Sequence, residues 1–233
     1  MSRRVNTKPA VGNGVAAAIL AGGKSKRMGQ HKALLPYKGK PLIEHLLARL
    51  KTDVQLLFVV GSPEPMLYRD IRFPVVPDVL EDIGPLGGIE TALRYVRETY
   101  LAQQDPAMQS KFAKTKANKK LLEKKADILY LLVVPCDGIL LPRLFVSRMV
   151  RALERQQADV VYAKDAAREQ HLYCLLKIEL CDSLQRYIEQ GGRKVIDWFH
   201  LQHYAVEDFS ADGFTFSNLN SADDWQLFLS QTL

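Results

Sequence analysis

Residues 15–32 read VAAAILAGGKSKRMGQHK, and this stretch decides the fold. Its first six residues, Val15 to Leu20, form an uncharged apolar run with the length and composition of a buried β-strand. The run leads directly into a loop that holds three glycines and four cationic side chains within eleven residues. Glycines let backbone amides approach an anion without an intervening Cβ atom, and the cations add positive charge. We therefore predict a strand that ends at a polyphosphate site; the alternative is a plain strand-to-helix turn with solvated lysines.

Two other glycine-rich loops are excluded by their spacing. A Walker A loop needs four residues between its glycines, followed by Lys and then Ser or Thr. Here five residues separate Gly23 from Gly29, and Gln30 follows. The stretch from Gly12 to Ala17 mimics a dinucleotide fingerprint, but it precedes the first strand instead of following it. We expect neither a P-loop NTPase nor a nicotinamide enzyme.

Apolar runs alternate with helical periods along the rest of the chain. This alternation predicts a three-layer α/β/α fold with a mostly parallel central sheet. We expect a flexible tail at residues 1–14 and a single domain at 15–233. The strands are expected at residues 15–20, 54–60, 74–76, 128–134, 158–163 and 172–176. Helices are expected from Pro41, from Ile89 after a turn-rich stretch, beyond Pro142, around Leu184 and from Ser221.

Composition narrows the class of protein. The chain has 233 residues, of which 47% are hydrophobic and 25% charged, so it has the composition of an ordinary globular protein. No apolar run reaches the roughly 18 residues of a membrane-spanning helix, and we expect no membrane association. The cysteines are three in number and lack metal-site spacing, which favours a reducing cytoplasm over a disulfide framework or a zinc site.

The net charge of +6 has a local origin. Seven lysines lie between residues 108 and 125 with Glu123 as the single acid, and the rest of the chain has 25 basic and 25 acidic residues. We place a lysine-rich insertion at about residues 103–126. It has one aromatic side chain, Phe112, and no arginine, so we do not expect nucleic acid as its partner. Two interpretations stay open: a solvated surface segment or a binding site for an anionic partner.

The loop after the first strand resembles that of a known family. Residues 20–32 follow the pattern LAGGxSxRMGxxK, which is similar to the signature loop of Rossmann-like nucleotidyltransferases and most closely to the molybdenum cofactor guanylyltransferase (MobA) family. GPLGG at 84–88 resembles the guanine-side loop, PCD at 135–137 the metal-binding strand end, and NLNS at 218–221 the C-terminal segment of that family. GRKV at 192–195 resembles a stretch near the pterin side. The resemblance covers about residues 15–229 without the lysine-rich insertion and implies a GT-A-like nucleotidyltransferase fold.

The position of Asp137 in the predicted fold also indicates a role in ligand binding. Asp137 follows the best-buried predicted strand, and the carboxyl ends of parallel strands border the crevice where open α/β sheets bind ligands. A carboxylate there is a suitable oxygen ligand for Mg²⁺ that bridges phosphates. The alternative is a carboxylate that caps the helix near Pro142, five residues on. The resemblance makes Asp137 a metal ligand and, with Arg27 and Lys32, a catalytic residue.

The resemblance also assigns the two substrate sides. Asp78 would accept hydrogen bonds from guanine, while the 84–88 loop could read the base edge or simply form the turn into the next helix. On the pterin side, His171 could instead be a structural histidine, because Leu172 stands where the family often has proline. Asn220 could hold the ion or a phosphate, or belong to the turn before the last helix. The implied nucleotide-binding residues are Leu20, Ala21, Gly22, Gly23, Lys32, Asp78, Gly84, Pro85, Leu86, Gly88 and Asp137, and the pterin-side residues are His171, Arg193, Lys194, Asn218 and Asn220.

Two departures from the family pattern concern base selection. Gly61-Ser62 stands where the family often has asparagine after the second strand, and Gly138 follows Asp137. The resemblance nevertheless implies transfer of GMP from GTP to molybdopterin, or its molybdenum-loaded form, with Mg²⁺ as cofactor. Other cofactor-biosynthesis proteins and molybdoenzyme chaperones would be partners. The alternatives are a transferase that uses CTP or a sugar-phosphate acceptor, and a non-enzymatic module that binds GTP or the cofactor.

Overall fold

The computed structural model describes residues 14–22, 31–78, 80, 83–113, 118–119, 127–216 and 225–226. Several predicted features therefore lie outside the described residues. They are the tail before Gly14, Gly23, Arg27, residues 114–117 and 120–126 of the lysine-rich insertion, Asn218, Asn220 and the start of the last helix at Ser221.

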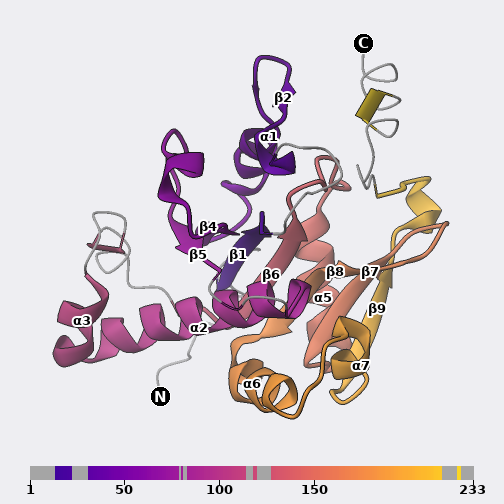
Figure 1. Cartoon of the computed structure of the whole chain (residues 1–233). Coiled ribbons are helices and arrows are strands. Elements are labelled where there is room, and N and C mark those ends of the chain that lie inside the picture. Colours follow the sequence, from indigo (N-terminus) through magenta and orange to yellow (C-terminus); the bar gives the residue numbers. More distant parts are fainter. Residues whose placement is uncertain are drawn as a thin grey trace, which may run out of the picture.

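Seven strands of the described chain form one central sheet, in the order β5-β4-β1-β6-β8-β7-β9 (Figure 1). Neighbouring strands are parallel except at β8, which runs antiparallel to both β6 and β7. The mostly parallel sheet expected from the sequence is confirmed. The strands are β1 (Val15–Leu20), β4 (Leu56–Gly61), β5 (Val75–Pro77), β6 (Tyr130–Pro135), β7 (Val160–Lys164), β8 (Glu169–Lys177) and β9 (Tyr204–Asp208).

Helices cover both faces of this sheet, so each strand buries side chains in two cores. Along β1, Val15, Ala17 and Ile19 face one core while Ala16 and Ala18 face the other. This alternation is the two-residue period of a β-strand, and burial on both faces explains why β1 reads as an unbroken apolar run. One core contains α1 (Leu42–Leu50) and α5 (Phe145–Gln156); the other contains α2 (Pro85–Gln104), α6 (Cys181–Glu189) and α7 (Val195–Phe199).

The observed elements differ from the predicted ones at several ends. The helix α2 begins at Pro85, inside the stretch predicted as turns, with Gly84 as its N-terminal cap and Pro85 at its first position. The strand β8 begins at Glu169, three residues earlier than predicted, and its direction reverses. Neither α7 nor β9 was expected; α7 has only five residues, and β9 at the sheet edge alternates exposed and buried positions weakly. The short hairpin β2 (Pro36–Tyr37) to β3 (Lys40–Pro41) was also not expected.

The range assigned to the lysine-rich insertion contains ordered helix. The helix α2 continues to Gln104, and α3 (Pro106–Phe112) follows it, with the Asp105 side chain accepting a hydrogen bond from the Ala107 N–H at 2.8 Å. The ring of Phe112 is buried and lies 5.7 Å from the ring of Tyr95, centroid to centroid. The aromatic side chain of this segment is therefore part of the core and is not presented for base stacking. Among the described residues, no helix is long and apolar enough to cross a membrane.

Candidate active site

The candidate site lies where parallel strands end on one edge of the sheet. Backbone hydrogen bonds tie these ends together: Cys136 donates to Leu20 at 3.0 Å, Ala21 donates to Val60 at 2.7 Å, and Asp78 donates to Gly61 at 2.8 Å. The chain positions just beyond β1, β4, β5 and β6 are thus held in register by the sheet itself. Ligands of open α/β sheets bind at this edge.

Lys32 and Asp137 meet at this edge although 105 positions separate them in the sequence. Lys32 Nζ lies 2.8 Å from Asp137 Oδ2, and the two side chains are 15% and 12% exposed. Lys32 comes from the short 3₁₀ helix η1 (Lys32–Leu34), and Asp137 follows β6. The helix α5 begins only at Phe145, with Leu144 as its N-terminal cap, so Asp137 does not cap it. Two residues predicted to face phosphate are therefore in direct contact.

Asp78 lies between two of the predicted glycines. A Cβ atom on Gly22 would lie 3.4 Å from Asp78 Oδ2, and one on Gly88 would lie 3.7 Å from the same oxygen and 3.2 Å from Leu20 Cδ2. Within the described chain, Asp78 Oδ1 accepts hydrogen bonds from the Leu80 N–H at 3.3 Å and the Thr91 hydroxyl at 3.4 Å. Burial raises the pKa of Asp78, and these two donors oppose the shift in part.

The loop before α2 contributes backbone to the same region. Gly84 has φ +66°, a conformation that favours glycine, and Pro85 takes the first helical position. The side chain of Leu86 is fully buried in the core, so only the backbone of Leu86 is placed to meet a ligand. The amino-terminal end of a helix carries partial positive charge, although Pro85 has no N–H and the Gly87 N–H already donates to the Gly84 carbonyl at 3.1 Å.

Two tyrosines that were not predicted from the sequence, Tyr68 and Tyr173, pack against the glycines that depart from the family pattern. A Cβ atom on Gly61 would lie 2.7 Å from Cζ and Oη of Tyr68. A Cβ atom on Gly138 would overlap Oη of Tyr173 and lie 2.7 Å from its Cε1. Burial raises the pKa of both phenols, and for Tyr173 the charge of Asp137 adds to the effect. The glycines themselves were the signal, since each leaves room for a ring that arrives from a distant part of the chain.

The described pterin-side candidates make their hydrogen bonds with residues other than Lys32 and Asp137. Arg193 donates to the carbonyl oxygens of Ile188 and Gly192 at 3.0 and 2.7 Å. Lys194 is the N-terminal cap of α7, and its carbonyl accepts a hydrogen bond from a tyrosine hydroxyl at 3.2 Å. His171 is partly buried; its Nε2 lies 3.1 Å from a Glu169 carboxylate oxygen. Their role toward a pterin stays a prediction.

A buried carboxylate anchors the chain that leads toward the C-terminus. Asp165 is fully buried and accepts hydrogen bonds from the N–H groups of Ala167, Arg168 and Phe216 and from the Gln170 side chain, at 2.9–3.0 Å. Burial alone would raise its pKa, but these donors outweigh burial and lower it. The Phe216 ring packs against Tyr173 at a centroid distance of 4.3 Å. Asp165 thus fixes Phe216 beside the tyrosine that touches Gly138.

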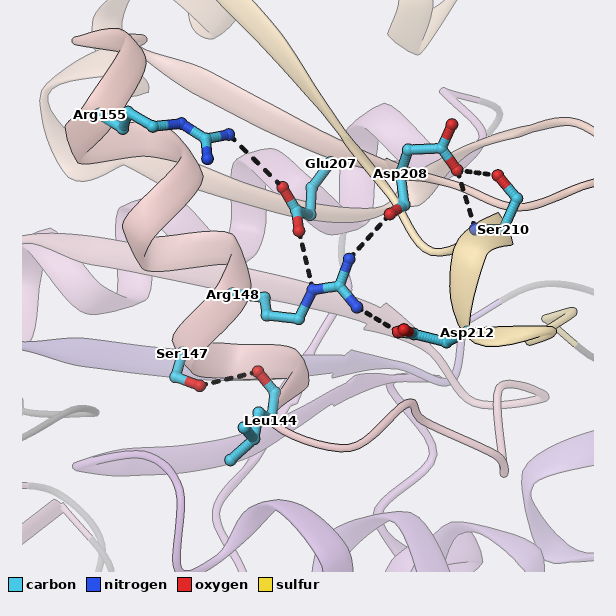
Figure 2. Close-up of polar contacts among 8 residues, drawn as sticks. All are labelled: Leu144, Ser147, Arg148, Arg155, Glu207, Asp208, Ser210 and Asp212. Atoms are coloured by element: carbon cyan, nitrogen blue, oxygen red, sulfur yellow. Dashed lines mark hydrogen bonds and ion pairs between the residues drawn. The ribbon is translucent and has the colours of Figure 1, made fainter.

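Arg148, on α5, binds residues 207–212, which precede Phe216 in the chain (Figure 2). Its Nε donates to Glu207 at 2.8 Å, one Nη donates to the Asp208 carbonyl at 2.8 Å, and the other pairs with Asp212. The guanidinium also lies 4.0 Å from the centroid of the Phe209 ring. One side chain therefore holds the end of β9 and the 3₁₀ helix η4 (Ser210–Asp212) against α5.

Metal binding at this edge would rest on few protein ligands. Among the described residues, no group of three or more His, Cys, Asp or Glu side chains is placed to hold a metal ion. Mg²⁺ commonly uses one or two carboxylates together with substrate phosphates and water. Asp137 therefore fits a Mg²⁺ ion that the nucleotide brings with it. Cys136 beside it is buried, and burial raises the pKa of its thiol to about 12, so it is a core residue.

Comparisons with known proteins identify the family to which the chain is related. Residues 17–205 match the family described as the MobA-like NTP transferase domain. The chain is 33% identical over 219 residues to the molybdenum cofactor guanylyltransferase of Shewanella putrefaciens, covering 93% of this chain and 97% of the relative. It is 34% identical over 214 residues to that of Shewanella sediminis, covering 90% and 93%.

A solved structure shows the same fold. The molybdopterin-guanine dinucleotide biosynthesis protein A from Archaeoglobus fulgidus superposes with a TM-score of 0.68 at 19% identity, covering 94% of this chain and all of that one. The expected nucleotidyltransferase fold is thereby confirmed. Because the family match spans most of the chain and the relatives match nearly end to end, the chain belongs to the family of MobA-like NTP transferases.

Proposed function

We propose that this protein is a guanylyltransferase that transfers GMP from GTP to molybdopterin, or its molybdenum-loaded form, and releases pyrophosphate. The observation that carries the proposal is the pairing of two half-sites on one sheet edge. Lys32 and Asp137 form a charged half suited to phosphates, and Asp78 with Gly22 and Gly88 forms a half suited to a base. The relatives named molybdenum cofactor guanylyltransferase support the choice of nucleotide and acceptor.

The reaction needs alignment more than acid–base chemistry. A terminal phosphate oxygen of the acceptor attacks the α-phosphorus of GTP, a new P–O bond forms, and the bond to the bridging oxygen breaks to release pyrophosphate. A phosphate monoester has its second pKa near ~6, so the nucleophile is already largely dianionic at neutral pH. What the protein supplies is positive charge and orientation where two anions meet.

Lys32 supplies positive charge at the edge of the sheet where the parallel strands end. Its ammonium group contacts Asp137 and, with three N–H donors, can also donate to a phosphate oxygen. Mg²⁺, which we propose as the cofactor, would bind Asp137 and neutralise charge on the triphosphate. Arg27 and the Gly22-Gly23 amides complete the proposed phosphate site.

Asp78 is the proposed reader of guanine. Guanine presents N1–H and N2–H donors on one edge, and a carboxylate accepts both. The backbone of Leu20, Ala21, Gly84, Pro85, Leu86 and Gly88 lines the proposed nucleotide site, and His171, Arg193, Lys194, Asn218 and Asn220 are proposed for the pterin side. The three described thiols are free and buried, which supports our placement of the reaction in a reducing cytoplasm.

The test is a direct assay of product. Purified protein is incubated with Mg²⁺, molybdopterin and each nucleoside triphosphate in turn, and the dinucleotide is identified by mass. We expect a guanine dinucleotide and one pyrophosphate per product, with neither formed when Mg²⁺ or the acceptor is omitted. A cytosine dinucleotide, or product from a sugar phosphate instead of the pterin, would overturn the proposed substrates. Tight GTP binding without any product would mean a non-enzymatic module.

A further inference from the structure

The Ala21–Gly22 peptide stands at the centre of the candidate site, and its own sequence does not fix its orientation. Two successive glycines, Gly22 and Gly23, follow Ala21. Because glycine has access to a wide range of backbone conformations, the plane of a peptide that precedes it is weakly restrained by sterics. Hydrogen bonds must therefore set the direction in which this peptide faces. The Ala21 N–H donates to Val60 at 2.7 Å and fixes the near side of the residue.

The far side is held by a tyrosine from another part of the chain. Tyr68, at the end of the 3₁₀ helix η2 (Pro65–Tyr68), donates its hydroxyl to the Ala21 carbonyl at 3.2 Å. The same hydroxyl accepts a hydrogen bond from the Ser62 N–H at 3.4 Å. Tyr68 is 3% exposed, and burial raises the pKa of its phenol, so the hydroxyl remains a donor at neutral pH.

Gly61 makes this contact geometrically available. The Tyr68 ring lies over Gly61 so closely that a Cβ atom there would meet Cζ and Oη at 2.7 Å. Gly61 also ends β4, beside the Asp78 N–H that donates to its carbonyl. The ring thus crosses the end of β4 to reach the end of β1, and a side chain at position 61 would block it.

In a trans peptide the C=O and N–H groups point in opposite directions. The bond from Tyr68 turns the Ala21 carbonyl toward η2, so the Gly22 N–H points away from η2. Within the described chain this N–H has no acceptor, and the adjacent Gly22 Cα lies beside the Asp78 carboxylate. We propose that Tyr68 is a positioning residue that orients the Ala21–Gly22 peptide so that the Gly22 N–H donates to the bound nucleotide. This inference rests on the proposed function, since it names a residue that prepares the same nucleotide site.

The experiment compares GTP affinity with stability in matched variants. In Tyr68→Phe the ring still fills the space over Gly61, but the hydroxyl is lost. We expect the Kd for GTP, measured by calorimetry with Mg²⁺, to rise about three- to tenfold, which corresponds to the net value of one hydrogen bond. Tyr95→Phe is the control, because it also removes a tyrosine hydroxyl bond, to Asn118 at 3.1 Å, ten residues into α2. We expect this control to bind GTP like the parent.

A second variant tests the same contact from its other side. Gly61→Ala should displace the Tyr68 ring and raise the Kd for GTP to a similar extent. In the double variant with Tyr68→Phe, the Kd should be no higher than in either single variant, because both changes break one interaction.

The outcomes separate the inference from the proposed function. If the parent protein binds no GTP, the proposed function fails. If the parent binds GTP and Tyr68→Phe binds it equally well with a lowered unfolding midpoint, Tyr68 is merely structural and the inference is overturned. Kd increases that multiply in the double variant would also overturn it.

Discussion

Two carboxylates stand at the same edge of the sheet in opposite surroundings. Asp137 contacts an ammonium group, Lys32, at 2.8 Å, whereas the hydrogen-bond donors to Asp78 within the described chain are neutral, a backbone N–H and a threonine hydroxyl. Each carboxylate is flanked by a glycine–tyrosine contact, Gly138 with Tyr173 and Gly61 with Tyr68. The difference indicates that the two halves of the site bind different parts of the substrate. The Asp137 half has paired charges to offer to phosphate and metal, and the Asp78 half has a partly desolvated acceptor to offer to N–H donors.

The largest effect is expected on the charged half. Asp137→Asn should lower turnover at least about 100-fold, because preorganised charge at a reacting centre is worth about that much, while circular dichroism shows the fold intact. Turnover is measured as pyrophosphate release with saturating GTP and acceptor. The matched control is Asp159→Asn, which breaks a Lys177–Asp159 pair of the same 2.8 Å length whose side chains are about one-third exposed. Parental turnover in Asp137→Asn would remove Asp137 from the reaction.

Substitution of Asp78, in the base half, should change the affinity for GTP. Asp78→Asn replaces an acceptor with a group that is half donor, so we expect the Kd for GTP to rise about 10- to 100-fold, the range of hydrogen bonds to a charged group. Inosine triphosphate lacks the N2 amino group and should bind the parent more weakly than GTP. In Asp78→Asn this preference should shrink. Equal preference in parent and variant would place guanine recognition elsewhere.

Substitution of the glycine should lower the stability of the protein to different extents at the two glycine–tyrosine contacts. Tyr173 lies on β8 next to Cys174, which pairs with Val133 of β6 and Tyr162 of β7, and its ring packs against Phe216 and Phe145. Tyr68 ends a four-residue 3₁₀ helix, η2, which is not part of the sheet. Gly138→Ala should therefore lower the free energy of unfolding by about 2 kcal/mol, within the range for overpacked cores, and by more than Gly61→Ala does.

Urea denaturation measures this difference, and the relief of strain provides its control. Gly138→Ala combined with Tyr173→Phe should regain part of the lost stability, since Oη is the atom that the new methyl group would overlap. Equal losses for Gly138→Ala and Gly61→Ala would mean that the sheet does not hold Tyr173 more firmly than η2 holds Tyr68.

Local signals predicted much of this edge from the sequence. The apolar run of β1 was predicted with its observed ends, and the positions of Lys32, Asp78 and Asp137 after strands were enough to bring them to one edge. Tertiary facts could not be predicted in this way. The reversal of β8 depends on pairing with β6 and β7, which no local pattern specifies, and α7 is too short for a helical period to show.

The tyrosines belong to the same class of missed features. Tyr68 and Tyr173 have no motif around them, and their roles follow from which glycine each one meets in the folded chain. The sequence contained the complementary half of the signal at Gly61 and Gly138, where the family pattern was broken. A glycine that replaces a side chain at a strand end is therefore a reason to search for the ring that occupies the space.

The smallest expected effect is the release of protons from Asp78, in the base half, when the nucleotide binds. Burial raises the pKa of Asp78 in the free protein, and guanine N–H donors would favour its charged form, so its pKa should fall on binding. At pH values near this raised pKa, GTP binding then releases protons, and affinity rises with pH until Asp78 of the free protein is fully charged. The gain is less than tenfold per pH unit. Calorimetry in two buffers of different ionisation enthalpy counts the protons, and Asp78→Asn should release fewer; an unchanged count in that variant would assign the linkage to the triphosphate instead of the carboxylate.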